Sequence, residues 1–146
     1  MAALAVAPLL LAANDAQIAT TPDAPGLTVS FTGLRSTKGL VRGCLTRNPA
    51  FFPDCDKDPH SMKASIPAGP NARMHFAAVA SGDYALSILH DENANARLDT
   101  MLGIPKEGVG FSENPRLRFS APKFDAARFH MGATDVTKQV EIKYFL

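Results

Sequence analysis

Apolar and polar residues alternate along several short stretches of the chain. In residues 27–34, Leu27, Val29 and Phe31 are separated by hydroxylated side chains. A period of two is typical of a strand with one buried and one exposed face. The same alternation predicts further strands at residues 40–46, 62–66, 74–80, 84–89, 117–119, 129–131 and 138–145. We therefore expect an all-β fold: a single antiparallel β-sandwich of about seven or eight strands, with an immunoglobulin-like or prealbumin-like Greek-key topology.

The apolar positions of these strands predict a single shared core. Its expected members, each on the apolar face of its strand, are Leu27, Val29, Phe31, Phe76, Tyr84, Leu86, Ile88, Phe129, Val140, Ile142 and Tyr144. The turn residues Ser81, Gly82 and Asp83 predict a hairpin between residues 74–80 and 84–89. The short link after residue 34 predicts another hairpin, between the first two strands.

The N-terminal residues suggest an exported protein. Residues 1–13 form an apolar run rich in alanine and leucine, which is typical of the hydrophobic part of a signal peptide. No basic residue precedes Arg35, so a signal peptide at residues 1–19 would be a truncated one, and a buried N-terminal helix is the alternative. The run is too short to cross a bilayer, and no later stretch is a transmembrane candidate. We expect a periplasmic or secreted chain with a flexible leader at residues 20–26 and one domain at residues 27–146.

Charge and cysteine content narrow the class of partner. The net charge is +1, and there is no cluster of basic residues or glycine-rich loop that would grip phosphates. Nucleic acid is therefore not an expected partner, whereas an envelope or extracellular ligand of unknown identity is.

The two cysteines, Cys44 and Cys55, predict a disulfide in an exported chain. Two buried free thiols would be expected in a cytosolic one.

The most informative stretch follows the strand at residues 84–89. Asp91, Asn93, Asn95 and Asp99 stand at positions 1, 3, 5 and 9 of a loop, with the carbonyl of Arg97 at position 7. Calcium loops of the EF-hand type present their oxygen ligands at these positions. We therefore name these five residues as a candidate calcium site of weak affinity.

Three features depart from an EF-hand. Position 6 is Ala96 where glycine makes the sharp turn easiest, and position 12 is Leu102 where a bidentate glutamate is expected. A strand enters the loop, whereas an EF-hand has a helix on each side. Glu92 or Glu107 would have to close the site instead. The alternative is that the aspartate and asparagine side chains cap the backbone of their own loop without any metal.

Enzymatic interpretations of the same stretch are weaker. Ser112, His90 and Asp91 contain the groups of a hydrolytic triad, but the sequence around the serine is not a nucleophile elbow. Glu92 and Glu107 are a pair of carboxylates whose separation in space the sequence does not give. His90 shares a face with the apolar residues of its strand, and we expect a hydrogen-bonded histidine at the rim of the core.

The stretch resembles a bacterial family of exported proteins that is classed as a domain of unknown function. The resemblance rests on H-D-x-N-x-N-x-x-x-D, then G-I-P-x-E-G-x-G-F-S, and then PKFDA at residues 122–126, and it covers residues 27–146. Ala96 stands where that family usually has glycine. The resemblance implies an exported all-β domain and no established activity. The signature positions that it implies are His90, Asp91, Asn93, Asn95, Asp99, Gly103, Ile104, Pro105, Glu107, Gly108, Gly110, Phe111 and Ser112.

Taken together, the sequence predicts an exported, non-enzymatic envelope or extracellular module. Its distinctive feature is the loop that ends at Ser112, and calcium is the one cofactor that this loop suggests. A hydrolase that uses His90, Glu92 or Glu107 is one alternative. A purely structural domain with a self-capped loop is the other.

Overall fold

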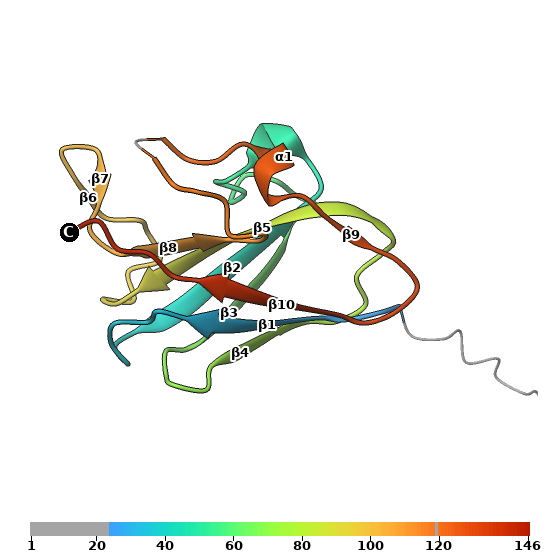
Figure 1. The fold of residues 1–146 in the computed structure, drawn as a ribbon, viewed down its shortest axis with the longest axis horizontal. Coiled ribbons are helices and arrows are strands. Elements are labelled where there is room, and N and C mark those ends of the chain that lie inside the picture. The colour runs from blue at the N-terminus through green and yellow to red at the C-terminus, as the bar shows by residue number, and fades with distance from the viewer. Residues whose placement is uncertain (1–23, 119) are drawn as a thin grey trace, which may run out of the picture.

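The computed structural model describes residues 24–118 and 120–146, and nearly all of their regular structure is β (Figure 1). The short helical segments are a 3-10 turn, Pro49–Phe51, and α1, Phe124–Ala127. The strands are β1 (Leu27–Thr32), β2 (Leu40–Thr46), β3 (Met62–Pro67), β4 (Arg73–Phe76), β5 (Gly82–Asp91), β6 (Thr100–Met101), β7 (Ile104–Pro105), β8 (Gly108–Phe111), β9 (Phe129–Met131) and β10 (Val136–Glu141). The predicted all-β class is thus confirmed. The expected signal peptide at residues 1–19 lies outside the described residues.

The strands form two main sheets and one small hairpin. The order is β10-β1-β4 in the first sheet and β3-β2-β5-β8 in the second, where β9 also pairs with the beginning of β5. β6 and β7 form a hairpin of their own. β1 is antiparallel to β4 but parallel to β10, so the expectation of a wholly antiparallel arrangement is wrong for this pair.

Both predicted hairpins are also wrong. β1 and β2 belong to different sheets, and so do β4 and β5. After β4 the chain crosses from the first sheet to the second, and Val79 in the crossing is fully buried. Its N–H donates to the carbonyl of Pro25 (2.9 Å), which fixes the crossing against the segment before β1. Of the strand predicted at residues 117–119, positions 117 and 118 lie in a loop, and 119 is outside the described residues.

One apolar core lies between the two main sheets. Leu27, Val29 and Val140 from the first sheet pack with Leu86 and Ile88 from the second. Every residue predicted for the core belongs to this cluster, with Phe31 and Tyr144 only partly buried at its margin. The alternation of the sequence therefore identified the buried faces correctly, because a strand with one solvated face must turn every second side chain inward.

The segment after β10 joins the two sheets at one edge. The N–H of Ile142 donates to the carbonyl of Thr32 (2.8 Å), and Lys143 exchanges two backbone hydrogen bonds with Val109 (3.0 and 2.8 Å). Gly108 and Gly110 of β8 allow this close approach. A Cβ at Gly110 would lie 2.6 Å from Val140, and one at Gly108 would lie 2.5 Å from Ile142.

Cys44 and Cys55 form the predicted disulfide, with their Cα atoms 6.2 Å apart. It ties β2 to the loop before β3. Asp58 fixes the same loop, because its carboxylate accepts from the hydroxyl of Thr46 (2.6 Å) and from the N–H of His60 (2.9 Å).

None of the helices in residues 24–118 and 120–146 has the length and hydropathy that crossing a bilayer requires.

The end of the expected flexible leader is fixed to the body. The N–H of Gly26 donates to the carboxylate of Asp135 (2.8 Å), and its carbonyl accepts from the N–H of Val136 (3.0 Å). Gly26 is therefore fixed to the domain, and residues 20–23 of the expected leader lie outside the described residues.

Candidate functional site

The candidate site begins at the end of β5, which pairs with a neighbouring strand on each side. His90 pairs with Val41 of β2 and with Gly108 of β8. Its side chain is fully buried beside the apolar core, next to the partly buried Tyr144 at the margin of that core. The expected hydrogen bonds are present: one ring nitrogen lies 2.7 Å from the hydroxyl of Tyr144 and the other 2.8 Å from the carbonyl of Lys38. Both ring nitrogens therefore have structural partners.

Asp91 is also fully buried, and its carboxylate organises the turn that follows. Arg42 donates to it from Nε (2.6 Å), and the backbone N–H groups of Asn95 (3.1 Å) and Ala96 (2.8 Å) donate to it as well. Burial alone would raise the pKa of this carboxyl, but the hydrogen bonds from Arg42, Ala96 and Asn95 outweigh burial and lower it. Asp91 is therefore held ionised as a cap for its own loop.

The asparagines and Asp99 continue this pattern. The side-chain oxygen of Asn93 accepts from the N–H of Asn95 (3.3 Å), and that of Asn95 accepts from the N–H of Arg97 (3.0 Å). The amide groups of both asparagines donate to the carboxylate of Asp99, at 2.9 Å from Asn93 and at 2.8 and 3.0 Å from Asn95. The alternating positions thus bring their side chains together in the structure, where the asparagine oxygens cap the backbone of the loop and the asparagine amides bind Asp99.

The turns require left-handed backbone at two alanines. Ala94 has φ 54° and Ala96 has φ 61°. A residue with a Cβ is disfavoured in this conformation by about 1–2 kcal/mol. The carboxylate of Asp91 and the other caps offset this cost, because they satisfy N–H groups that the strand ladder no longer serves.

Glu107, from the link between β7 and β8, lies against the same loop. It is 5% exposed, and its carboxylate accepts from the N–H of Asp99 at 3.4 Å. Burial raises the pKa of Glu107, and the nearby charges of Asp91 and Asp99 raise it further. Glu92 is directed elsewhere, since it accepts from Arg35 (3.0 Å) and from the hydroxyl of Ser36 (2.8 Å). Of the two glutamates considered as a closing group, Glu107 is the one beside the loop.

The structure does not assemble a hydrolytic triad from Ser112, His90 and Asp91. The hydroxyl of Ser112 donates to the carbonyl of Ala127 (2.5 Å) and accepts from the N–H of Leu86 (3.0 Å). This serine anchors the end of the loop to α1 and β5. Phe111 beside it packs edge-on against Phe52, with ring centroids 5.8 Å apart.

No three histidine, cysteine, aspartate or glutamate side chains in residues 24–118 and 120–146 are grouped as metal ligands. The calcium site at Asp91, Asn93, Asn95, Arg97 and Asp99 therefore stays a prediction. Sequence analysis missed the partners that fix the loop from outside, Arg42, Lys38 and Tyr144. They are distant in sequence and carry no motif.

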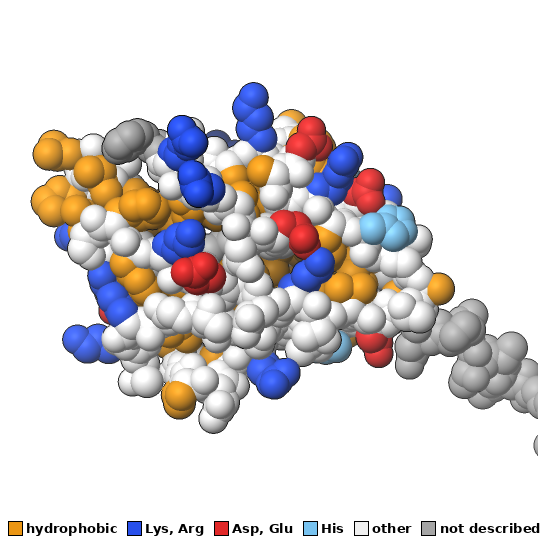
Figure 2. All heavy atoms as spheres, viewed as in Figure 1, with side chains coloured by type: hydrophobic (Ala, Val, Ile, Leu, Met, Phe, Trp, Pro, Cys, Tyr) orange, Lys and Arg blue, Asp and Glu red, His pale blue; other side chains and the backbone are white. Residues whose placement is uncertain are grey.

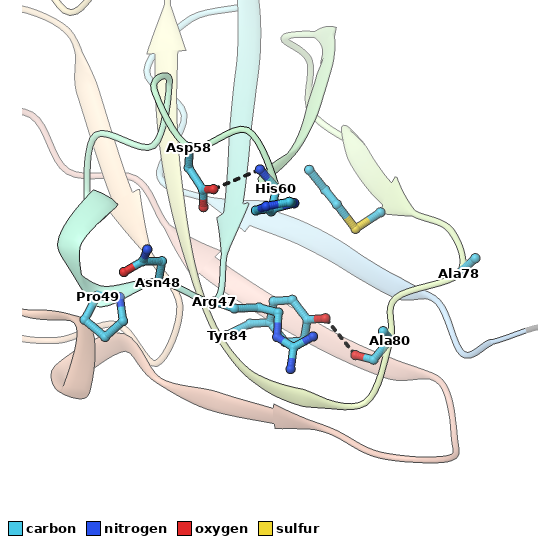
Figure 3. A pocket seen from close by; sticks show the side chains of 9 residues that line it. Arg47, Asn48, Pro49, Asp58, His60, Ala78, Ala80 and Tyr84 are labelled. Carbon is cyan, nitrogen blue, oxygen red and sulfur yellow. Dashed lines mark hydrogen bonds between the residues drawn. The ribbon is translucent and has the colours of Figure 1, made fainter.

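A shallow depression of about 560 Å³ lies at the other end of β5 (Figure 3). Two of its polar side chains contact each other or the nearby backbone: the hydroxyl of Tyr84 donates to the carbonyl of Ala80 (2.7 Å), and the guanidinium of Arg47 lies over the Tyr84 ring at 5.5 Å. No sequence motif marks this region. Its lining residues are Arg47, Asn48, Pro49, Asp58, His60, Met62, Ala78, Ala80 and Tyr84.

Comparison with models of known families identifies the family of this chain. Residues 29–139 match the model of a family described as "Uncharacterized protein conserved in bacteria (DUF2141)". The chain belongs to the DUF2141 family. The match confirms the resemblance to a bacterial domain of unknown function, and it spans the whole loop of this DUF2141 member. The finer signature, H-D-x-N-x-N-x-x-x-D with G-I-P-x-E-G-x-G-F-S, stays a prediction. No curated protein and no solved structure matches the chain significantly.

Proposed function

We propose that this DUF2141 member is an exported, non-enzymatic envelope or extracellular domain whose loop at residues 90–112 is a rigid element held by its own hydrogen bonds. One observation carries the proposal: three of the groups that a hydrolase would use, His90, Ser112 and Glu92, are engaged in structural bonds. His90 bonds Tyr144 and Lys38, Ser112 bonds Ala127 and Leu86, and Glu92 bonds Arg35 and Ser36. The shared core of the two sheets also supports the predicted sandwich.

The disulfide supports export. Disulfides form and persist in oxidising compartments and are rare in the cytosol. The test is to express the full chain in a bacterium, separate periplasm from cytoplasm, and label free thiols in each fraction. We expect the protein in the periplasm or the medium, with no free thiol. A cytoplasmic protein with two reactive thiols would contradict export.

A second candidate function is weak binding of calcium by the loop. The observation that favours it is the position of Glu107, which is buried against the loop and accepts from the N–H of Asp99. Burial raises the pKa of Glu107, and the charges of Asp91 and Asp99 raise it further. A divalent cation would offset this repulsion. The side-chain oxygens of Asn93 and Asn95 are the neutral ligands that this candidate adds, after rotation of their amides away from Asp99. A dissociation constant of about 10⁻⁴–10⁻³ M is expected, as in extracellular modules.

Thermal melts of the wild type, Glu107→Gln and Glu141→Gln, each in chelator and in calcium, distinguish a loop that binds calcium from a loop that is only self-capped. Calcium binding with a Kd in that range would stabilise the wild type by about 0.4–1.4 kcal/mol at 1 mM calcium. Glu107→Gln should lose this gain, whereas Glu141→Gln, which changes an exposed glutamate of β10, should keep it. A wild-type melting temperature that calcium leaves unchanged would reject the calcium candidate and leave the rigid, self-capped loop.

The same Glu107→Gln variant gives a prediction for pH. Because the pKa of Glu107 is raised in the folded chain, its contribution to stability is present at low pH and is lost as pH rises. In chelator, the variant should therefore be more stable than the wild type at pH 7. The two free energies of unfolding should converge below about pH 4, where glutamate is ordinarily protonated. Urea titrations at both pH values measure the difference, and a variant less stable at pH 7 would contradict it.

A further inference from the structure

The β6–β7 hairpin exposes large aliphatic side chains at the outer end of the loop. We call this set the apolar tip: Leu98 (46% exposed), Met101 (50%), Leu102 (97%) and Ile104 (43%). Figure 1 shows the hairpin projecting from the body, and Figure 2 shows hydrophobic side chains gathered at that end with lysine and arginine side chains beside them. Exposed apolar residues gathered in one place mark interaction sites more often than single ones do.

The backbone at Leu102 makes this exposure costly. Leu102 has φ 52° and Gly103 has φ 78°, which is the conformation of a two-residue type I′ hairpin turn. Asparagine or aspartate is preferred at the first of these positions, and leucine is disfavoured there. With 97% of its surface exposed, Leu102 gains almost no packing in return. A strained, exposed leucine indicates a contact outside the chain.

The exposed charges that flank the tip are positive. Arg97 and Lys106 flank it and are exposed, and neither forms an ion pair with any described residue. The nearby acids are turned away: the carboxylate of Asp99 accepts from two asparagine amides, and Glu107 is buried. The outer surface of the hairpin is therefore apolar at its end and positive at its sides.

We propose that the apolar tip inserts into an anionic lipid surface, with Arg97 and Lys106 on the headgroups. Aliphatic side chains combined with flanking cations are the chemistry of interfacial membrane binding. The four exposed side chains of the tip are all non-aromatic, whereas aromatic anchors are enriched at the centres of protein interfaces; the exposed Phe145 belongs to the C-terminal segment and not to the hairpin. The inference goes beyond the proposed function, because it requires neither calcium nor a particular cellular compartment.

Sedimentation with lipid vesicles tests the proposal, in chelator so that calcium cannot bridge the protein to the lipid. Vesicles of phosphatidylcholine alone are compared with vesicles that contain equal amounts of phosphatidylcholine and phosphatidylglycerol. The wild type should bind the anionic vesicles, and added salt should weaken this binding. Leu102→Asn should weaken it about tenfold, because it removes an inserted side chain while favouring the same turn.

The cations have a matched control elsewhere on the chain. Replacing Arg97 and Lys106 together by alanine should weaken binding roughly thirtyfold, at about 1 kcal/mol for each cation near the surface. The double replacement of Lys57 and Arg73 by alanine, which removes the same charge from exposed positions outside the loop, should leave binding nearly unchanged. Equal losses in the two double variants would overturn the assignment to the tip.

Fluorescence gives an independent readout. The chain has no tryptophan, so Leu102→Trp introduces a single reporter at the tip. Its emission should shift to the blue with anionic vesicles, whereas Lys57→Trp should show no shift.

Three results would overturn the proposal: no binding to anionic vesicles, equal binding by wild type and Leu102→Asn, or concentration-dependent self-association that Leu102→Asn abolishes while vesicle binding is absent. The last would assign the tip to a second copy of the chain.

Discussion

The base and the tip of the 90–112 loop differ in which side chains they bury. At the base, Asp91 is fully buried and Glu107 nearly so, and the amides of Asn93 and Asn95 are directed at Asp99. At the tip, the exposed side chains are leucine, methionine and isoleucine. A soluble loop ordinarily shows the opposite arrangement, with charges outside and apolar groups inside.

The difference shows which part of the loop is needed for folding. The charged groups at the base have partners that satisfy them, so their burial is compatible with a stable fold. The apolar groups at the tip are exposed among the residues that the structure describes, and folding of that part of the chain does not explain them. We infer that the base holds the loop in shape and that the tip makes the contacts of the loop with other molecules.

The largest effect should come from breaking the base with Asp91→Ala. The change removes the acceptor for two backbone N–H groups and removes the carboxylate partner of Arg42. Removing one member of a buried pair costs about 3–5 kcal/mol, and the lower end applies because Arg42 is partly exposed. Urea unfolding measures the loss. The control Asp56→Ala, which breaks an exposed pair with Lys63, should cost less than about 1 kcal/mol.

A smaller effect of opposite sign should follow from Ala96→Gly. Glycine adopts φ 61° without the clash of a Cβ, so the variant should gain about 0.5–1 kcal/mol after the greater entropy of the unfolded glycine is subtracted. Ala77→Gly, at an exposed position where φ is not left-handed, should lose about 0.4–1 kcal/mol. A loss of stability in Ala96→Gly would show that the turn at the base differs from the one described.

The smallest effect on stability is expected at the tip. Leu102→Asn should leave the free energy of unfolding unchanged or raise it by less than about 0.5 kcal/mol, because Leu102 packs against almost nothing and asparagine is preferred in the left-handed conformation of this turn. Differential scanning calorimetry of the isolated protein measures it. A loss above about 2 kcal/mol would mean that Leu102 is buried in the folded chain, and the contrast with the base would fail.

Much of the fold could be predicted from alternation. The bounds of β2, Leu40–Thr46, are those the sequence predicts, and the shared core contains every residue expected in it. Strand partners could not be predicted in this way. Alternation shows which face of a strand is buried but not which neighbour it has, so the parallel pairing of β1 with β10 and the crossing at Val79 were missed.

The candidate site was only partly predictable. The spacing of the sequence identified the alternating residues of the loop. It did not decide whether Glu92 or Glu107 closes the candidate site, because the order of the chain does not show that Glu92 binds Arg35. The exposure of the tip was missed, since leucine and isoleucine ordinarily suggest burial. One signal was present: Leu102-Gly103 stands between two short β segments, where Asn-Gly would be expected, with Arg97 and Lys106 on either side.

Amide hydrogen exchange of the wild type in chelator tests the contrast between base and tip most directly. The N–H groups of Asn95 and Ala96 donate to the buried carboxylate of Asp91, so they should exchange only when the domain unfolds. The N–H groups of Leu102 and Gly103, in the exposed turn, should exchange quickly by local motion. Protection at the base close to the global free energy of unfolding, with little protection at the tip, is the predicted result. Rapid exchange at Asn95 and Ala96 would contradict a rigid loop held by its own hydrogen bonds.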